Sequence, residues 1–199
     1  DNTLYPPHML LFDQIEEKMT AFVMREVGVA RDEANHLRHT YWAKYGTTLA
    51  GLMHHHNVAP EPYLIEVHDI SFEPIQSDLL LRDAIERLPG RKIIYTNGSA
   101  PYAEKVVEAR GLTGVFSEIY GVEHARFHPK PQASAFEQVF EKAAVNPTKA
   151  AMFEDDPRNL SVPHAMGLRT VLVTPEPAPA NHIEYHTDDL TAFLMSLQP

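Results

Sequence analysis

The chain has 199 residues, 44% of them hydrophobic and 22% charged, and no stretch approaches the roughly 18 unbroken apolar residues of a membrane span. Its formal net charge of −10, without a compact basic stripe, argues against a nucleic acid polymer as partner. The absence of cysteine excludes disulfides, a thiol nucleophile and a cysteine-ligated metal.

This length suits one α/β core with an insert better than two independent domains. The lack of cysteine fits a reducing compartment, and no apolar leader precedes the first helical pattern. We therefore expect a cytoplasmic protein that does not associate with membranes. The composition leaves its oligomeric state open.

The first part of the chain, residues 9–89, carries helical patterns and no strand-like run. Apolar residues recur at spacings of three and four along Leu11, Ile15, Met19 and Phe22, and the stretches 33–44 and 79–88 repeat this spacing. We predict that this part is entirely helical.

Beyond Pro89, short apolar runs alternate with helical patterns. We expect strands at 92–96, 116–120, 150–153 and 170–173, and helices at 100–110, 133–144, 157–166 and 188–197. This alternation is typical of βαβ units and predicts an α/β fold with a doubly wound parallel sheet. The proline-rich stretch 174–181 is expected to be an exposed connection.

Four polar clusters punctuate this pattern: residues 1–3 at the start, 96–99 after a predicted strand, 128–131 in a connection, and 154–156 after another strand. Ligands of parallel sheets bind beyond the carboxyl ends of the strands, so we expect these clusters to meet. The first three each have a plainer interpretation as a turn, helix cap or surface loop. Adjacent carboxylates favour a bound cation, and together with a hydroxyl, an amide and a lysine they suit a phosphoryl group.

The order of these clusters resembles the four motifs of the haloacid dehalogenase superfamily of phosphohydrolases: an Asp-x-Asp-x-Thr strand end, a Thr or Ser, a Lys, and an acidic pair. The stretch DNT matches the tail of the first motif, Thr96 the second, Lys130 the third, and Glu154 with Asp155 the fourth. The resemblance implies that the family's nucleophilic aspartate lies two positions before Asp1, on the central first strand of the sheet. Both are expected outside the printed sequence.

The resemblance further implies two-step hydrolysis of a small phosphate ester through an aspartyl-phosphate, with Asp1 as general acid and base. The catalytic residues would be Asp1, Thr96 and Lys130. The phosphoryl-binding residues would be Thr96, Asn97, Gly98 and Lys130. The ligands of Mg²⁺ would be Asp1, Glu154 and Asp155. An acid at Asp1 favours ester cleavage over dehalogenation, because an alkoxide leaving group needs a proton and a halide does not.

The helical segment 9–75 lies between the first two motifs, where the superfamily inserts a helical cap that closes over the active site. The resemblance therefore implies a Rossmann-like core of residues 1–8 and 76–199 and an all-helical cap of the C1 type at 9–75.

Three stretches resemble the pyrimidine 5′-nucleotidase branch of the superfamily: YWAKYGTTLAGL at 41–52, LYPP at 4–7 and FEDDPRNL at 153–160. This resemblance implies a pyrimidine nucleoside monophosphate such as UMP or CMP as substrate. Tyr45, Gly46 and His68 are candidates to contact the leaving group. The helical spacing of Tyr41, Trp42 and Tyr45 fits ordinary helix packing equally well.

Two alternatives to a nucleotidase remain open. One is a phosphatase or phosphomutase for a sugar or other small phosphate, and the other is a non-catalytic phosphate-binding protein. The triplet His54, His55 and His56 is not expected to bind zinc, because neighbouring side chains on a helix point about 100° apart. His128, beside the motif lysine, is a candidate to support its loop.

Overall fold

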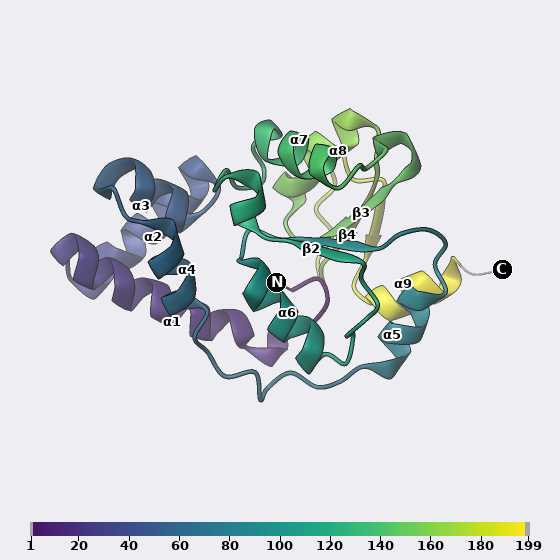
Figure 1. Ribbon diagram of the computed structural model, residues 1–199, viewed down its shortest axis with the longest axis horizontal. Helices are drawn as coiled ribbons and strands as arrows, with labels where there is room; N and C mark the ends of the chain where they lie inside the picture. The colour runs from purple at the N-terminus through teal and green to yellow at the C-terminus, as the bar shows by residue number, and fades with distance from the viewer. Residues whose placement is uncertain (1, 198–199) are drawn as a thin grey trace.

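The structure is a computed structural model that describes residues 2–197. A helical part lies to one side of a core built of strands and helices (Figure 1). The first part contains α1 (Leu11–Val23), α2 (Arg31–Tyr45), α3 (Thr48–His56) and α4 (Pro60–Val67). A 3₁₀ turn precedes α1 at Pro7–Met9, and a π-helical turn follows it at Met24–Gly28. No strand occurs in the described chain before β1, but residues 69–78, which follow α4, form no helix, so the helical prediction for 9–89 is confirmed only outside this connection.

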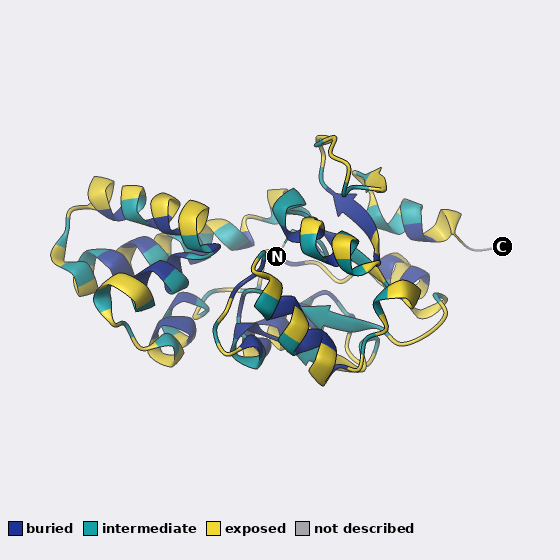
Figure 2. Cartoon of the chain, turned by 90° about the horizontal axis from the view of Figure 1, so that it is seen from above, coloured by how far each residue is buried: buried dark blue, intermediate teal, exposed yellow. Residues whose placement is uncertain are grey.

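The inward faces of α1 to α4 form an apolar cluster, and their outward faces are exposed (Figure 2). Leu11, Val23 and Leu52 are fully buried in it. Tyr5, from the start of the chain, and Tyr102, from the core, belong to the same cluster. Because the cluster continues into the core, the boundary of 9–75 stays a prediction.

Within residues 2–197, the core contains two parallel sheets. In the first, β1 (Ile93–Tyr95) pairs with β2 (Glu118–Tyr120) in the register Ile94 to Ile119. In the second, β3 (Ala151–Glu154), β4 (Arg169–Val173) and β5 (Tyr185–Thr187) lie in that order. The predicted α/β fold with parallel strands is thereby confirmed.

Helices cover both faces of these sheets (Figure 1). On one face lie α7 (Ala133–Lys142) and α8 (Ser161–Met166), and on the other α5 (Leu79–Glu86), α6 (Ala100–Ala109) and α9 (Leu190–Ser196). Successive strand residues point to opposite faces. Met152 therefore packs in the cluster of α7 and α8, whereas Ile94 and Phe153 pack in the cluster of α5, α6 and α9.

Two predicted elements differ in the structure, and one observed strand was not predicted. The second strand starts at Glu118 and not at 116, because Phe116 precedes the ladder and packs against α5 and α9. The helix predicted at 157–166 is a 3₁₀ turn, Pro157–Leu160, followed by α8. The edge strand β5 was not predicted, because two of its three residues, YHT, are exposed and it carries no apolar run.

Within residues 2–197, no helix combines the length and apolar character needed to cross a bilayer.

Gly51 sets the distance between α2 and α3. A Cβ atom added to Gly51 would lie 2.1 Å from Cγ of Tyr41. We predict that Gly51→Ala lowers the free energy of unfolding by about 1–3 kcal/mol through overpacking, although alanine favours a helix by about 1 kcal/mol. Urea denaturation measures this, with Tyr41→Ala and the double variant completing a mutant cycle. Strictly additive losses would mean that the ring does not limit the approach of the helices.

Candidate active site

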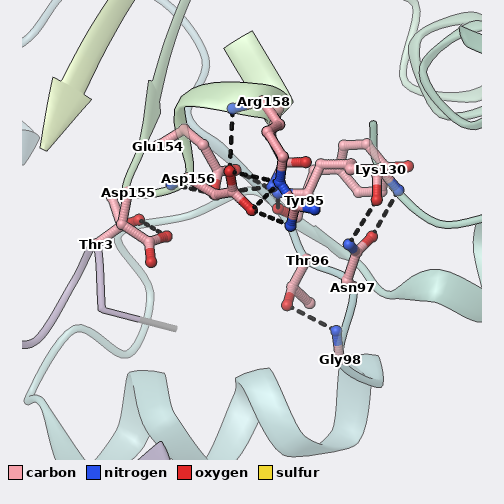
Figure 3. Close-up of polar contacts among 11 residues, drawn as sticks. Thr3, Tyr95, Thr96, Asn97, Gly98, Lys130, Glu154, Asp155, Asp156 and Arg158 are labelled. Carbon is pink, nitrogen blue, oxygen red and sulfur yellow. Dashed lines mark hydrogen bonds and ion pairs between the residues drawn. The ribbon is translucent and has the colours of Figure 1, made fainter. Parts of the chain in front are cut away.

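Three segments of the core meet beyond the carboxyl ends of β1 and β3 (Figure 3). Thr96 directly follows β1, Lys130 lies in the connection before α7, and Glu154 ends β3 with Asp155 after it. Figure 3 shows Thr3, from the start of the chain, on the same side as Asp155. The structure thus brings together residues that the sequence separates by more than 150 positions.

A buried ion pair lies at the centre of this site. Lys130 Nζ donates hydrogen bonds to Glu154 Oε2 at 2.5 Å and to the Tyr95 carbonyl at 3.3 Å. Lys130 and Glu154 are only 5% and 6% exposed. Burial alone would raise the pKa of Glu154, but the charge of Lys130 and its hydrogen bond outweigh burial and lower this pKa to about 2. Glu154 is therefore an anion held by the lysine.

Asp155 is the acid of this loop with an unfavourable environment for its charge. The Thr3 hydroxyl donates a hydrogen bond to Asp155 Oδ1 at 3.2 Å. Burial and the negative charge of Glu154 raise the pKa of Asp155 to about 6. A divalent cation would reverse this effect by stabilising the ionised carboxylate. Asp155 therefore fits a position that a metal ion would occupy.

The third acid of the loop, Asp156, is neutralised in a different way. Arg158 Nη2 donates to Asp156 Oδ2 at 2.6 Å, and the Arg158 amide donates to Asp156 Oδ1 at 3.0 Å. Asp156 thus caps the 3₁₀ turn and holds Arg158. This arrangement separates the roles of the three adjacent acids, because Glu154 pairs with Lys130, Asp156 with Arg158, and Asp155 is left for a cation.

Asn159 is a site residue that the sequence reasoning missed. Its Nδ2 donates to Glu154 Oε1 at 3.2 Å, and the residue is 6% exposed. Its Oδ1 is buried and accepts no hydrogen bond within the described chain. A buried acceptor without a partner is costly, so this oxygen fits a cation or its bound water. One feature of the sequence could have indicated Asn159 as a site residue. It lies four residues after Asp155, across a turn that contains Pro157.

The segment after β1 forms a tight turn into α6. The Thr96 amide continues the ladder by donating to the Tyr120 carbonyl at 2.9 Å, and the Gly98 amide donates to Thr96 Oγ1 at 2.9 Å. Ser99 caps α6 by accepting a hydrogen bond from the Tyr102 amide at 3.3 Å. Thr96 is consequently fixed at the amino end of a helix, where the backbone favours an anion.

The side chain of Asn97 has a role that was not expected. Its Nδ2 donates to the Lys130 carbonyl at 3.0 Å, and its Oδ1 accepts from the Lys130 amide at 2.8 Å. These two hydrogen bonds to one residue hold the connection that carries Lys130, called the lysine connection below, against the turn after β1. The Asn97 side chain is therefore committed to Lys130, and the predicted contact of Asn97 with a phosphoryl group would have to use its backbone amide.

Two of the predicted leaving-group residues lie at the end of α2. Gly46 has a φ of +93°, and a Cβ atom there would lie 2.7 Å from the Lys130 carbonyl oxygen. The Tyr45 carbonyl accepts a hydrogen bond from Gln132 Nε2 at 3.2 Å, while the Tyr45 hydroxyl lies 2.7 Å from His55 Nε2. The end of α2 is therefore docked on the lysine connection.

A second contact joins α2 to the loop that carries the three adjacent acids, residues 154–156, called the acidic loop below. The guanidinium carbon of Arg158 lies 3.6 Å from the centre of the Trp42 ring. This is a close cation–π contact between two parts of the chain that the sequence separates. The helical part consequently touches both the lysine connection and the acidic loop.

The third predicted leaving-group residue, His68, lies at the carboxyl end of α4. Its ring stacks on Tyr102 with 4.3 Å between the ring centres, and its Nδ1 lies 3.2 Å from Ser99 Oγ. Burial is the main reason that the pKa of His68 falls to about 4. The ring is therefore neutral at physiological pH.

Asp1, predicted as a catalytic residue and metal ligand, lies outside the described residues. Within 2–197, no group of three or more histidine, aspartate and glutamate side chains gathers as a metal site. The histidine triplet 54–56 at the end of α3 contacts tyrosines, since the Tyr41 hydroxyl lies 2.7 Å from His56 Nε2. His128 Nδ1 lies 3.3 Å from Ser134 Oγ on α7, which fits its expected role in supporting the loop.

Comparison with known proteins adds a family to this geometry. A family model described as haloacid dehalogenase-like hydrolase matches residues 24–173. Among solved structures, a HAD phosphatase from Thermococcus onnurineus superposes with a TM-score of 0.62 at 17% identity, covering 99% of this chain and 94% of that one.

Other structures of this fold carry different chemistry. A Thermotoga maritima protein provisionally named as a beta-phosphoglucomutase matches with a TM-score of 0.59 at 15% identity, covering 99% of this chain and 94% of that one. An L-2-haloacid dehalogenase from Xanthobacter autotrophicus, with chloropropionic acid covalently bound, matches with a TM-score of 0.53 at 14% identity. The match covers 94% of this chain and 85% of that one. At these identities the likeness concerns the fold alone.

The buried pair generates a stability prediction. Lys130→Met leaves the Glu154 carboxylate buried without its cation, so we expect a loss of about 3–5 kcal/mol in the free energy of unfolding. Adding Glu154→Gln should recover part of it. Arg87→Met is the matched control, because its ion pair with Asp83 is more than half exposed and should contribute below about 1 kcal/mol. Equal losses in the two single variants, measured by urea denaturation, would contradict the central role of the pair.

His68 generates a prediction about pH. Its pKa is about 4 in the folded chain and about 6.5 in the unfolded chain. As the pH falls, the unfolded state therefore takes up a proton before the folded state does. Stability should therefore fall from pH 6.5 to 4. His68→Phe removes this contribution, so the gap in unfolding free energy between wild type and variant should change by about 2–3 kcal/mol across that window. Parallel pH profiles in denaturation experiments would refute the assignment.

Proposed function

The chain belongs to the haloacid dehalogenase-like hydrolase family, and on that premise we propose that it is a Mg²⁺-dependent phosphomonoesterase acting on a pyrimidine nucleoside 5′-monophosphate. The observation that carries the proposal is the buried pair of Lys130 and Glu154, 2.5 Å apart, with Thr96 on one side and Asp155 on the other. This arrangement offers a cation, a hydroxyl and a metal-type acid to one small anionic group.

The phosphoryl group is bound by Lys130, Thr96 and the backbone amide of Asn97. Thr96 Oγ1 already accepts the Gly98 amide at 2.9 Å, so its own hydrogen is free for a phosphoryl oxygen. Lys130 contributes a buried ammonium, whose bonds to oxyanions are stronger than those of a neutral donor. Glu154 keeps this ammonium in position. It also balances the charge of the ammonium when no phosphoryl group is bound.

Mg²⁺ is the proposed cofactor, because the available donors are oxygens and the site offers no cysteine. Asp155 and the unpaired Oδ1 of Asn159 fit the ion, and the Thr3 hydroxyl orients Asp155. When bound, the ion would neutralise charge on the phosphoryl oxygens. The proposed nucleophile is the aspartate expected two positions before Asp1, and the proposed general acid and base is Asp1.

Ester hydrolysis is preferred over dehalogenation because of the acidic loop. Expulsion of a halide needs neither a proton nor a cation, whereas a phosphate dianion needs its charge neutralised. Asp155, whose ionised form is disfavoured until a cation binds, has an evident use only in the second reaction. The nucleoside part of the proposal rests on the resemblance of 41–52 and 153–160 to the nucleotidase branch.

The first test is a substrate panel. UMP and CMP should be hydrolysed with Mg²⁺ and not with EDTA, and at least tenfold faster than sugar phosphates. Comparable rates on sugar phosphates would favour the alternative of a sugar phosphatase or phosphomutase. Binding of vanadate without turnover of any ester would instead favour a phosphate-binding protein.

The metal site generates a mutational prediction. Asp155→Asn keeps the shape of the side chain but removes its charge, so we expect a loss of more than about 100-fold in Mg²⁺-dependent turnover, as for other groups that act on transition-state charge. Asp156→Asn is the matched control, because Asp156 pairs with Arg158, and it should cost no more than about tenfold. Similar losses in both variants would place the metal elsewhere in the loop.

A further inference from the structure

His68 belongs to the helical part by sequence, but the core determines the position of its ring. The ring lies flat on Tyr102, with ring centres 4.3 Å apart and 9° between the planes. Tyr102 is itself held, since its hydroxyl lies 3.1 Å from that of Tyr5. Ser99, which contacts His68 Nδ1, is the N-cap of α6, and Tyr102 lies in the first turn of this helix. The imidazole is therefore a fixed group beside the turn that carries Thr96.

Ser99 engages one nitrogen of the imidazole. Its hydroxyl accepts the Tyr102 amide at 3.3 Å and lies 3.2 Å from His68 Nδ1. A hydroxyl oxygen has two acceptor sites as well as its own hydrogen, so either tautomer of the ring satisfies this contact. Nε2 is the nitrogen that can face a ligand, as a donor in one tautomer and as an acceptor in the other.

Gly98 shows where Nε2 lies relative to the phosphoryl site. A Cβ atom on Gly98 would lie 3.3 Å from Thr96 Oγ1 and 3.5 Å from His68 Nε2. The hydroxyl, the imidazole nitrogen and Tyr102 Cδ1, which lies 3.1 Å from the same position, therefore surround Gly98 closely. A substrate atom that reaches both Thr96 Oγ1 and His68 Nε2 would lie beyond this position, in the part of the leaving group adjacent to phosphorus.

We infer that His68 is a specificity-determining residue, whose Nε2 forms a hydrogen bond with a sugar hydroxyl of the leaving group next to the phosphoryl group. This inference rests on the proposed function and adds a requirement to it. The leaving group must carry a hydroxyl close to phosphorus, as a ribose does and a phenyl group does not. Binding of the phosphoryl group itself does not need His68.

The test compares two substrates in the His68→Phe variant, which keeps a ring on Tyr102 and removes both nitrogens. We expect kcat/KM to fall about 10–100-fold for UMP, the range for an unpaired polar group in a binding site, and to change less than about twofold for phenyl phosphate. His68→Gln, which presents an amide N–H, should recover part of the loss. His56→Phe is the matched control, since His56 ends α3 and its Nε2 lies 2.7 Å from the Tyr41 hydroxyl, among the helices and not beside Thr96.

Equal losses on both substrates would overturn the inference, because they would mean that His68 only supports the turn around Thr96. Unchanged kinetics on both would overturn it as well. If the protein hydrolyses ribose 5-phosphate and not UMP, the nucleotide assignment fails while the same contrast with phenyl phosphate still tests His68. If no ester turns over, calorimetry decides, since His68→Phe should weaken binding of UMP and leave inorganic phosphate unchanged.

Discussion

The buried ion pair between Lys130 and Glu154 is the constraint on which the rest of the site depends. Transfer of each charge from water costs several kcal/mol, and the attraction between the two offsets this cost only in good geometry. The end of β3, the Tyr95 carbonyl at the end of β1 and the lysine connection must therefore converge. A pair of this kind contributes little net stability compared with apolar residues, so its value lies in presenting one oriented ammonium beside Asp155.

The backbone of Lys130 is held from two directions. Within the core, Asn97 bonds both its amide and its carbonyl. From the helical part, Gly46 approaches the same carbonyl so closely that a side chain would not fit. The glycine adopts a φ of +93°, which other residues rarely reach. Two parts of the chain thus fix one residue, and the position of the ammonium depends on how they dock.

Local pattern in the sequence predicted the helical first part, four of the strands and the polar clusters at the strand ends, because periodicity and turn residues act within a few positions. The edge strand β5 was missed because its pairing with β4 depends on a distant partner. Asn97 reads as an ordinary helix-cap residue, and only the tertiary contact with Lys130 reveals its role. Asn159 was missed for a similar reason, because the 3₁₀ turn at Pro157–Leu160 brings it back to Glu154.

The stacking of Arg158 on Trp42 joins α2, the proposed side of substrate selection, to the loop proposed to retain the cation. Arg158 contacts α2 with its face and Asp156 with its edge. In the proposed function, a shift of α2 that accommodates a leaving group would be transmitted through Arg158 to the loop that follows Asp155. Thermodynamic reciprocity would require the converse, so a cation in this loop would change the affinity of α2 for the leaving group by the same factor. Ion and ester would then bind as cooperative ligands, and neither affinity has a single value independent of the other.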